Sequence, residues 1–206
     1  MLEPIYEARA DFPRLVVLHE LWADASQDPR ERIVRLRKVA ALCEEQLHDP
    51  DRAFSAYGRA VRDALADPDL VPLLNALQRL TVARHKWAEL VALYRDIGAD
   101  VLDAAVQQRI YLTVAQLART QLQDLELSRD YFRRVLDQVP DHEGALDALE
   151  GLYLETGDHE RLLEILHRRA ELSEGDLEAK RAYLGRAALI CEEQLGRPIE
   201  AITIYE

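Results

Sequence analysis

The chain has 206 residues, of which 49% are hydrophobic and 31% charged, and its formal net charge is −12 at pH 7. The hydrophobic fraction excludes a generally disordered chain, and the negative charge argues against a nucleic-acid partner, which needs a dense basic face. No apolar run approaches the ~20 residues of a membrane-spanning helix. We therefore expect neither nucleic-acid binding nor membrane insertion.

Apolar residues recur at intervals of three and four along most of the chain, which is the spacing of one helical face. Ile33, Leu36, Val39, Cys43 and Leu47 show this spacing. No stretch alternates with period two for long enough to form a strand. In chain order, we predict helices over residues 2–9, 13–25, 29–47, 51–66, 69–84, 87–101, 103–122, 125–138, 142–156, 159–173, 176–195 and 198–206.

The sequence CEEQL occurs at Cys43–Leu47 and again, 148 residues later, at Cys191–Leu195. A related segment lies midway, with Ala118 in place of the cysteine, and it keeps Gln121 and Leu122. A reactive cluster would need the thiol and the two carboxylates, whereas a packing unit needs only the small residue and the leucine. We therefore interpret CEEQL as part of an architectural repeat.

Other landmarks recur at the same distance and predict three units of about 1–68, 69–140 and 141–206, which form a single repeat domain over 1–206. They are Phe12, Trp87 and His159; Gln46, Gln121 and Gln194; and Tyr57, Phe132 and Tyr205. Each unit holds four helices, or two hairpins. A single hairpin cannot bury its apolar stripe, so neighbouring hairpins should stack, with small residues such as Ala53 and Ala201 where helices cross.

The two ends of the chain look like interior parts of a repeat. Leu2–Leu15 aligns with Leu77–Leu90 and Leu149–Leu162, which places Met1 inside a helix, and Glu206 falls inside another. We expect the chain to be a fragment of a longer protein. Apolar residues at these ends should be exposed and should allow end-to-end self-association; they are Leu2, Ile5, Ile202 and Ile204.

Residues with catalytic or metal-binding chemistry are scattered. The histidines share no metal-ligand spacing and are expected on the surface or in turns; they are His19, His48, His85, His142, His159 and His167. The adjacent glutamates of CEEQL are interpreted as solvated charge. The basic pairs Arg37-Lys38, Arg133-Arg134 and Arg168-Arg169 are interpreted as solvated faces with local ion pairs. Phosphate-loop, dinucleotide, hydrolase and zinc-protease motifs are absent. We therefore expect no enzyme activity, no cofactor and no metal.

The two cysteines, Cys43 and Cys191, occupy equivalent repeat positions two hairpin pairs apart, too distant to form a disulfide. We interpret them as small core residues. Free thiols are typical of a reducing compartment, so we expect a cytoplasmic protein.

The chain resembles the tetratricopeptide repeat family over essentially its whole length, and the best match runs from Ser128 to Gly157. Ser128, Phe132, Val135 and Pro140 match the second helix of that repeat, and Leu146, Leu149, Tyr153 and Gly157 match the first helix of the next. The resemblance is degenerate, because the family's tryptophan is absent and alternate hairpins differ in length. It implies an all-α fold: a right-handed superhelical array of antiparallel helical hairpins, or α-solenoid.

The resemblance also implies a concave groove lined by the first helix of each hairpin. The matching positions carry Lys38, Asn75, Arg79, Arg109, Gln116, Asp147 and Arg186. These residues form a candidate clamp for a peptide or partner protein, and the alternative is that they are ordinary exposed residues. We expect a non-catalytic interaction scaffold. A second hypothesis is an accessory region that presents substrates to a catalytic domain elsewhere in the parent chain, and a third, modular RNA binding, conflicts with the acidic charge.

Overall fold

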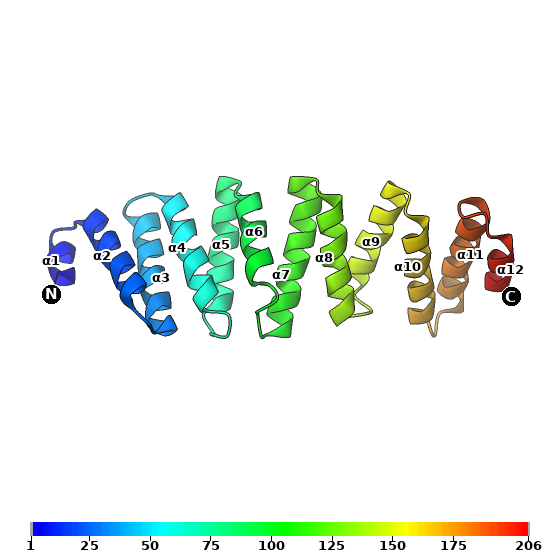
Figure 1. Ribbon diagram of the computed structural model, residues 1–206, viewed down its shortest axis with the longest axis horizontal. Coiled ribbons are helices and arrows are strands. Elements are labelled where there is room, and N and C mark those ends of the chain that lie inside the picture. The colour runs from blue at the N-terminus through cyan, green and yellow to red at the C-terminus, as the bar shows by residue number, and fades with distance from the viewer. Residues whose placement is uncertain (1, 206) are drawn as a thin grey trace. The chain divides into compact units, whose positions relative to one another are not determined.

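The structure is a computed structural model that describes residues 2–205, with the backbone alone at Tyr205. The expected placements of Met1 and Glu206, and the packing of the Tyr205 side chain, lie outside the described residues. In the described range the chain forms twelve α-helices and one short π-helix, with no strand (Figure 1). The predicted all-α class is therefore confirmed.

The α-helices are α1 (Glu3–Ala8), α2 (Phe12–Ala25), α3 (Pro29–Glu45), α4 (Pro50–Asp63), α5 (Leu70–Arg84), α6 (Trp87–Ile97), α7 (Ala104–Leu117), α8 (Leu125–Gln138), α9 (Glu143–Thr156), α10 (His159–Leu172), α11 (Leu177–Glu193) and α12 (Pro198–Tyr205). They lie where the apolar spacing predicts them. The predicted helix over 103–122 differs at its end, because α7 passes into a π-helical turn, η1 (Ala118–Leu122). Prediction also made the helix over 87–101 too long, since α6 ends at Ile97.

The chain divides into two compact units, Met1–Ile110 and Tyr111–Glu206, so the boundary falls inside α7. In the first unit α3 packs on α2 and α4, and α4 packs on α5. In the second unit α9 packs on α8 and α10, and α11 packs on α10 and α12. Figure 1 shows that successive helices within each unit run in opposite directions, as hairpins do.

The core of each unit consists of the apolar helix stripes that the sequence predicts. Leu36, Leu77 and Leu90 are buried in the first unit, and Leu149 and Leu162 in the second. The small residues expected at helix crossings are also buried, including Ala53 and Ala201. Both cysteines are buried and unpaired, as predicted.

Six hairpin turns share one backbone conformation. Each contains a residue with positive φ, in the left-handed region, and the second helix begins two residues after it. These residues are Ala10, His48, His85, Gln123, Gly157 and Gly196. At Asp11, Asp49, Asp124 and Asp158 the following side chain caps the second helix by accepting a backbone N–H. Only the last two turns use glycine, the residue that adopts this region without steric cost.

Two forms of this turn alternate along the chain. After Ala10, His85 and Gly157, the next backbone N–H donates to the carbonyl five residues back. After His48, Gln123 and Gly196 it donates six residues back, to the carbonyls of Cys43, Ala118 and Cys191 respectively. The backbone therefore repeats every two hairpins at the positions that the sequence alignment predicts. CEEQL marks the wider turn, and its cysteine supplies a buried small side chain and a hydrogen-bonding carbonyl.

Candidate functional site

The seven predicted groove residues divide between the two compact units. Lys38, Asn75, Arg79 and Arg109 lie in the first unit, on α3, α5 and α7. Gln116, Asp147 and Arg186 lie in the second, on α7, α9 and α11. The structure thus describes two groups of residues on first helices, each of which is built within its own unit.

In the first unit, two of the predicted basic residues are paired with carboxylates of the preceding first helix. Lys38 Nζ lies 2.6 Å from Glu3 Oε1 and 3.0 Å from Glu7 Oε1. Arg79 Nη2 lies 2.6 Å from Glu44 Oε2. The hydrogen bond to Glu3 raises the pKa of Lys38 and lowers the pKa of Glu3. The positive charge of Lys38 and of Arg79 is therefore balanced by a neighbouring carboxylate.

Arg109 and Asn75 are brought into direct contact. Arg109 Nη2 donates to Asn75 Oδ1 at 2.6 Å and to Gln78 Oε1 at 2.7 Å. Two of the predicted groove residues therefore form one hydrogen-bonded cluster, together with Gln78, which sequence reasoning missed.

In the second unit, Asp147 and Arg186 belong to one ion-pair network that also contains Arg169 and Glu150. Arg169 pairs with Asp147 and places its Nε 3.0 Å from Glu150 Oε2. Arg186 Nη2 lies 2.5 Å from Glu150 Oε1. Arg186 and Asp147 are thus connected through Glu150 and Arg169, which the sequence prediction did not include. Gln116 is exposed on α7 and stands outside this network.

These contacts share a sequence separation of about one hairpin. Arg79 and Glu44 are 35 residues apart, Arg109 and Asn75 are 34, and Arg186 and Glu150 are 36. The basic residues of the predicted clamp therefore reach back to the previous first helix. The positive charges of Arg79 and Arg186 are balanced by carboxylates of the same unit, whereas Arg109 is held by two neutral amides.

Exposed apolar side chains accompany the polar residues on the same helices. Val34 on α3 is 60% exposed and Val82 on α5 is 62% exposed, and Val71 near the start of α5 is also exposed. Val71, Asn75 and Val82 are separated by four and seven residues, which places them on one face of α5. Arg79 lies on the same helix face, so the first helices of the first unit combine aliphatic and hydrogen-bonding groups.

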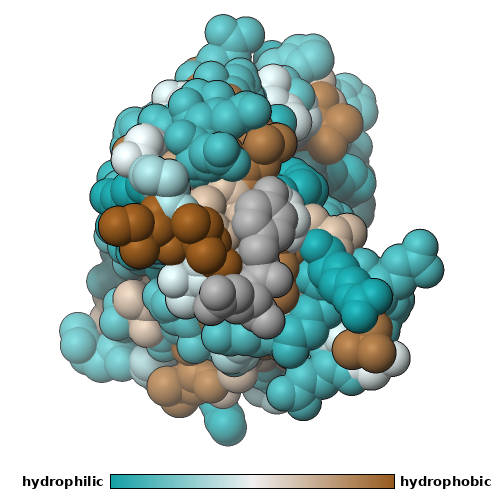
Figure 2. All heavy atoms as spheres, turned by 90° about the vertical axis from the view of Figure 1, so that its right-hand side faces the viewer, coloured by the Kyte–Doolittle hydropathy of each residue, from teal (hydrophilic) through white to brown (hydrophobic). Residues whose placement is uncertain are grey.

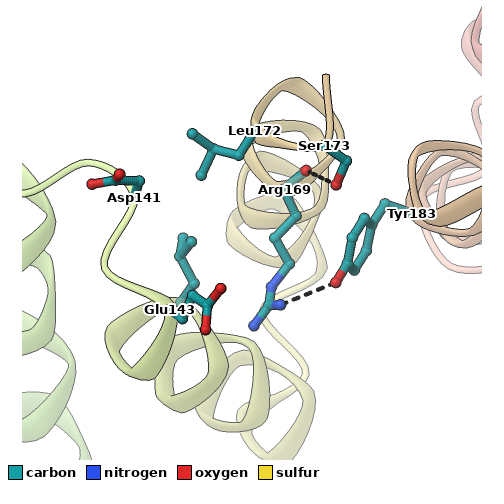
Figure 3. Close-up of a pocket in the computed structure, with 7 residues that line it drawn as sticks. Asp141, Glu143, Arg169, Leu172, Ser173 and Tyr183 are labelled. Atoms are coloured by element: carbon teal, nitrogen blue, oxygen red, sulfur yellow. Dashed lines mark hydrogen bonds between the residues drawn. The ribbon is translucent and has the colours of Figure 1, made fainter. Parts of the chain in front are cut away.

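A cavity of 290 Å³ lies among α9, α10 and α11 in the second unit, with Arg169 reaching into it (Figure 3). The Arg169 guanidinium donates to the Tyr183 hydroxyl at 3.2 Å, and its carbon lies 5.5 Å from the centre of that ring. Asp141 and Glu143 lie on the side of Arg169 that faces away from Tyr183 in Figure 3. The cavity is therefore lined by the Arg169 side chain and by two carboxylates.

Arg169 forms the expected local ion pairs, but its placement on a solvated face is wrong, since its side chain is only 14% exposed. Its partner in the basic pair, Arg168, donates to the carbonyl oxygen of Leu136 at 3.2 Å. The repeat alignment contains the signal for this burial, because Arg169 occupies the position of Trp22 in α2 and of buried Ile97 in α6.

The predicted surface placement is also wrong for His19, which is fully buried on α2. Leu15, His19 and Ala23 form one buried stripe at intervals of four. The equivalent positions in α6 and α10 carry Tyr94 and Leu166, which are buried as well. A histidine at this position is therefore a core residue, and burial lowers its pKa.

Over residues 2–205, no group of three or more His, Cys, Asp or Glu side chains is arranged to hold a metal ion. None of the helices described there is both long and apolar enough to cross a membrane. Burial raises the pKa of Cys43 to about 11, which disfavours the thiolate at neutral pH.

Comparison with known proteins assigns no family. No family model matches the chain, and no curated protein matches it. Among solved structures, the chain is similar to BtubC (BKLC) from P. vanneervenii, with 18% sequence identity and a TM-score of 0.43 over 95% of this chain and 85% of that one. Function must therefore be argued from the residues themselves.

Proposed function

We propose that the chain is a non-catalytic scaffold of the tetratricopeptide-like solenoid kind, whose first helices hold a peptide or a partner protein. The observation that carries this proposal is the surface of α3 and α5 in the first unit. There, exposed Val34, Val71 and Val82 accompany Asn75 and Arg79. Exposed aliphatic groups next to hydrogen-bonding side chains suit a peptide, which offers both apolar side chains and a polar backbone.

The ion pairs and hydrogen bonds of the first helices support the same proposal. Arg79, Arg109 and Arg186 are held by acceptors on the preceding first helix, at 2.5–2.6 Å. Side chains held in this way are partly ordered before a ligand arrives, which lowers the entropic cost of binding. The carboxylates that balance Arg79 and Arg186 favour a partner recognised by shape and hydrogen bonds over a strongly acidic one. The two buried, unpaired cysteines support a cytoplasmic location.

The test compares affinity capture by the native chain with capture by two variants. Val34→Glu combined with Val82→Glu places charge on the proposed surface, and Ala66→Glu combined with Ala99→Glu adds the same charge at exposed loop positions. We expect the first variant to lose the proteins that the native chain captures and the second to retain them. A third variant, Arg79→Ala, Arg109→Ala and Arg186→Ala, should weaken capture by removing hydrogen-bond donors. Equal capture by all variants would refute this surface.

A further inference from the structure

Two charged residues of the second unit lie mostly inside it. Figure 2 shows hydrophilic side chains over most of the face at the C-terminal end of the chain. By contrast, the side chains of Glu150 on α9 and Arg169 on α10 are only 15% and 14% exposed. A charge that is removed from water is costly unless an opposite charge and hydrogen bonds compensate it. The groups around these two residues therefore show what this position in the repeat requires.

Glu150 and Arg169 form a contact of three helices with Tyr183 on α11. Arg169 Nε lies 3.0 Å from Glu150 Oε2. The same guanidinium approaches Tyr183, since its carbon lies 5.5 Å from the centre of the ring and it donates to the hydroxyl at 3.2 Å (Figure 3). Arg186, also on α11, lies 2.5 Å from the other oxygen of the Glu150 carboxylate. The guanidinium of Arg169 is therefore shared between a carboxylate and an aromatic ring.

The equivalent contact in the first unit has the same three groups, but the guanidinium and the ring have exchanged helices. The equivalents of Glu150, Arg169 and Tyr183 are Glu3, Trp22 and Arg35, respectively. The guanidinium carbon of Arg35 on α3 lies 4.5 Å from the centre of the Trp22 ring on α2, and its Nη1 lies 3.7 Å from Glu3 Oε2. Lys38, at the position of Arg186, pairs with the same carboxylate. A guanidinium is therefore shared between a carboxylate and a ring here as well.

The middle copy of this contact, among α5, α6 and α7, carries neither the charges nor the ring. Its equivalent residues are Gln78, Ile97 and Ile110, and the position of Arg186 is occupied by Thr113. Both isoleucines are buried, and Gln78 accepts a hydrogen bond from Arg109 at 2.7 Å. The carboxylate thus occurs in the two copies that have a guanidinium, and a neutral amide replaces it in the copy that has two isoleucines.

We propose that this contact is the site at which a hairpin recognises the hairpin that follows it. In the outer copies the recognition group is one guanidinium held between a carboxylate and an aromatic ring. The carboxylate comes from the first helix of the leading hairpin. The guanidinium and the ring come from its second helix and from the next first helix, in either order. The middle copy instead matches neutral side chains with neutral side chains.

Each wrong pairing of hairpins would leave a group without its partner. The hairpin of α1 and α2, placed on α11, would bring the Trp22 and Tyr183 rings together with no guanidinium between them and the carboxylate. The hairpin of α9 and α10, placed on α3, would bring Arg169 and Arg35 together with no ring. The hairpin of α5 and α6 would place a neutral amide opposite a cation on either helix. Unpaired charge of this kind selects against wrong neighbours.

The first test exchanges the guanidinium and the ring in the second unit. Arg169→Trp alone leaves two rings and no guanidinium at this position, Tyr183→Arg alone leaves two guanidinium groups and no ring, and the two changes together recreate the arrangement of the first unit. In urea denaturation of the whole chain, each single change should increase the unfolding constant by about tenfold, and the double change should recover most of that loss. Additive losses in the double variant, or single variants as stable as the native chain, would overturn the proposal.

The second test converts the same contact into the neutral one of the middle copy. Arg169→Ile alone takes from Glu150 one of its two cations and should increase the unfolding constant by about tenfold. The complete conversion comprises Glu150→Gln, Arg169→Ile, Tyr183→Ile and Arg186→Thr.

Although it changes four residues, the complete conversion should be more stable than Arg169→Ile alone, because it restores a matched set. Arg181→Ile, at an exposed site on α11, is the control and should unfold like the native chain. A complete conversion that is no more stable than Arg169→Ile, or an equal loss for Arg181→Ile, would show that this position does not select matched groups.

Discussion

The Nε2 atom of His19 lies 3.3 Å from Oε1 of Glu3, in the contact between α2 and α1. His19 is fully buried, and Glu3 also faces Lys38 and Arg35 of α3. Burial is the main cause that lowers the pKa of His19, and the positive charge of Lys38 adds to it, while Glu3 and Glu7 act in the opposite direction. The contact therefore holds a neutral imidazole next to an ionised carboxylate.

This arrangement predicts that mild acid destabilises the first unit. Since the folded state lowers the pKa of His19 below 6.5, the unfolded chain binds the proton more readily. The contribution of His19 to the free energy of unfolding should therefore be fully present above about pH 6.5. It should be lost as the pH falls through and below that value. Glu3, whose pKa is also lowered, adds stability above pH 4.5 that is lost in stronger acid.

Urea denaturation of the native chain and of His19→Leu, between about pH 8 and pH 5, measures this effect. Leucine is the residue at the equivalent position of α10, Leu166, which is buried. The variant should show a smaller loss of stability over this range, since the other five histidines are common to both proteins. Parallel curves for the two proteins would show that His19 does not carry the pH dependence.

The close crossing of helices at Ala53 predicts a large effect of a buried charge. Ala53 is fully buried on α4, so Ala53→Asp would place a carboxylate in the core without a partner. We expect a loss of about 3 kcal/mol or more in the free energy of unfolding, seen as a lower urea midpoint. Ala66→Asp, at an exposed position, should stay within about 0.5 kcal/mol of the native chain. Similar midpoints for both variants would show that α4 is not packed as described.

The ion pairs around Glu150 should contribute more to the free energy of unfolding than ion pairs at the surface. Glu150 is mostly buried and pairs with both Arg169 and Arg186. Glu150→Ala should cost about 1–3 kcal/mol, because it leaves the mostly buried guanidinium of Arg169 with less compensation. Glu126→Ala removes an exposed pair with Arg129 and should cost no more than about 1 kcal/mol. Thermal or urea unfolding distinguishes the two, and an equal or reversed order would contradict the network.

The left-handed turn residues offer a stabilising change. Gln123 has φ of 55° and is exposed, and its equivalent in the last turn is Gly196. Gln123→Gly should raise the free energy of unfolding by about 0.5–1 kcal/mol, because glycine adopts this region without strain. Arg133→Gly, in the middle of α8, should lower it by about 1 kcal/mol. A destabilised Gln123→Gly would argue against the left-handed geometry of this turn.

The sequence predicts the helices well because their signals are local. Apolar spacing and Asp-Pro starts lie within a few residues of the structure that they specify, as at Asp28 and Asp49. Partners of charged residues are harder to predict. Arg79 and Glu44 are separated by a whole hairpin, so their contact depends on how neighbouring hairpins stack. The predicted clamp residues therefore lie on first helices, but their pairing appears only in the structure.

The two wrong placements, His19 and Arg169, have the same cause. Both were interpreted from residue type, since histidine and arginine are usually exposed. Their repeat positions carry the opposite information, because Tyr94 and Leu166 occupy the position of His19, and Ile97 occupies that of Arg169. In a repetitive chain, the burial of equivalent positions is a better guide than the residue type alone.

The alternation of five-residue and six-residue hydrogen bonds at the hairpin turns limits how such a chain can change in length. Loss of one hairpin would make two successive turns have the same form. Each helix that follows would then pack against a neighbour that it does not meet in the native order. Loss or gain of two hairpins, about 73 residues, restores the order. Insertions and deletions that preserve folding should therefore come in double-hairpin steps, and relatives of this chain should differ in length by multiples of that step.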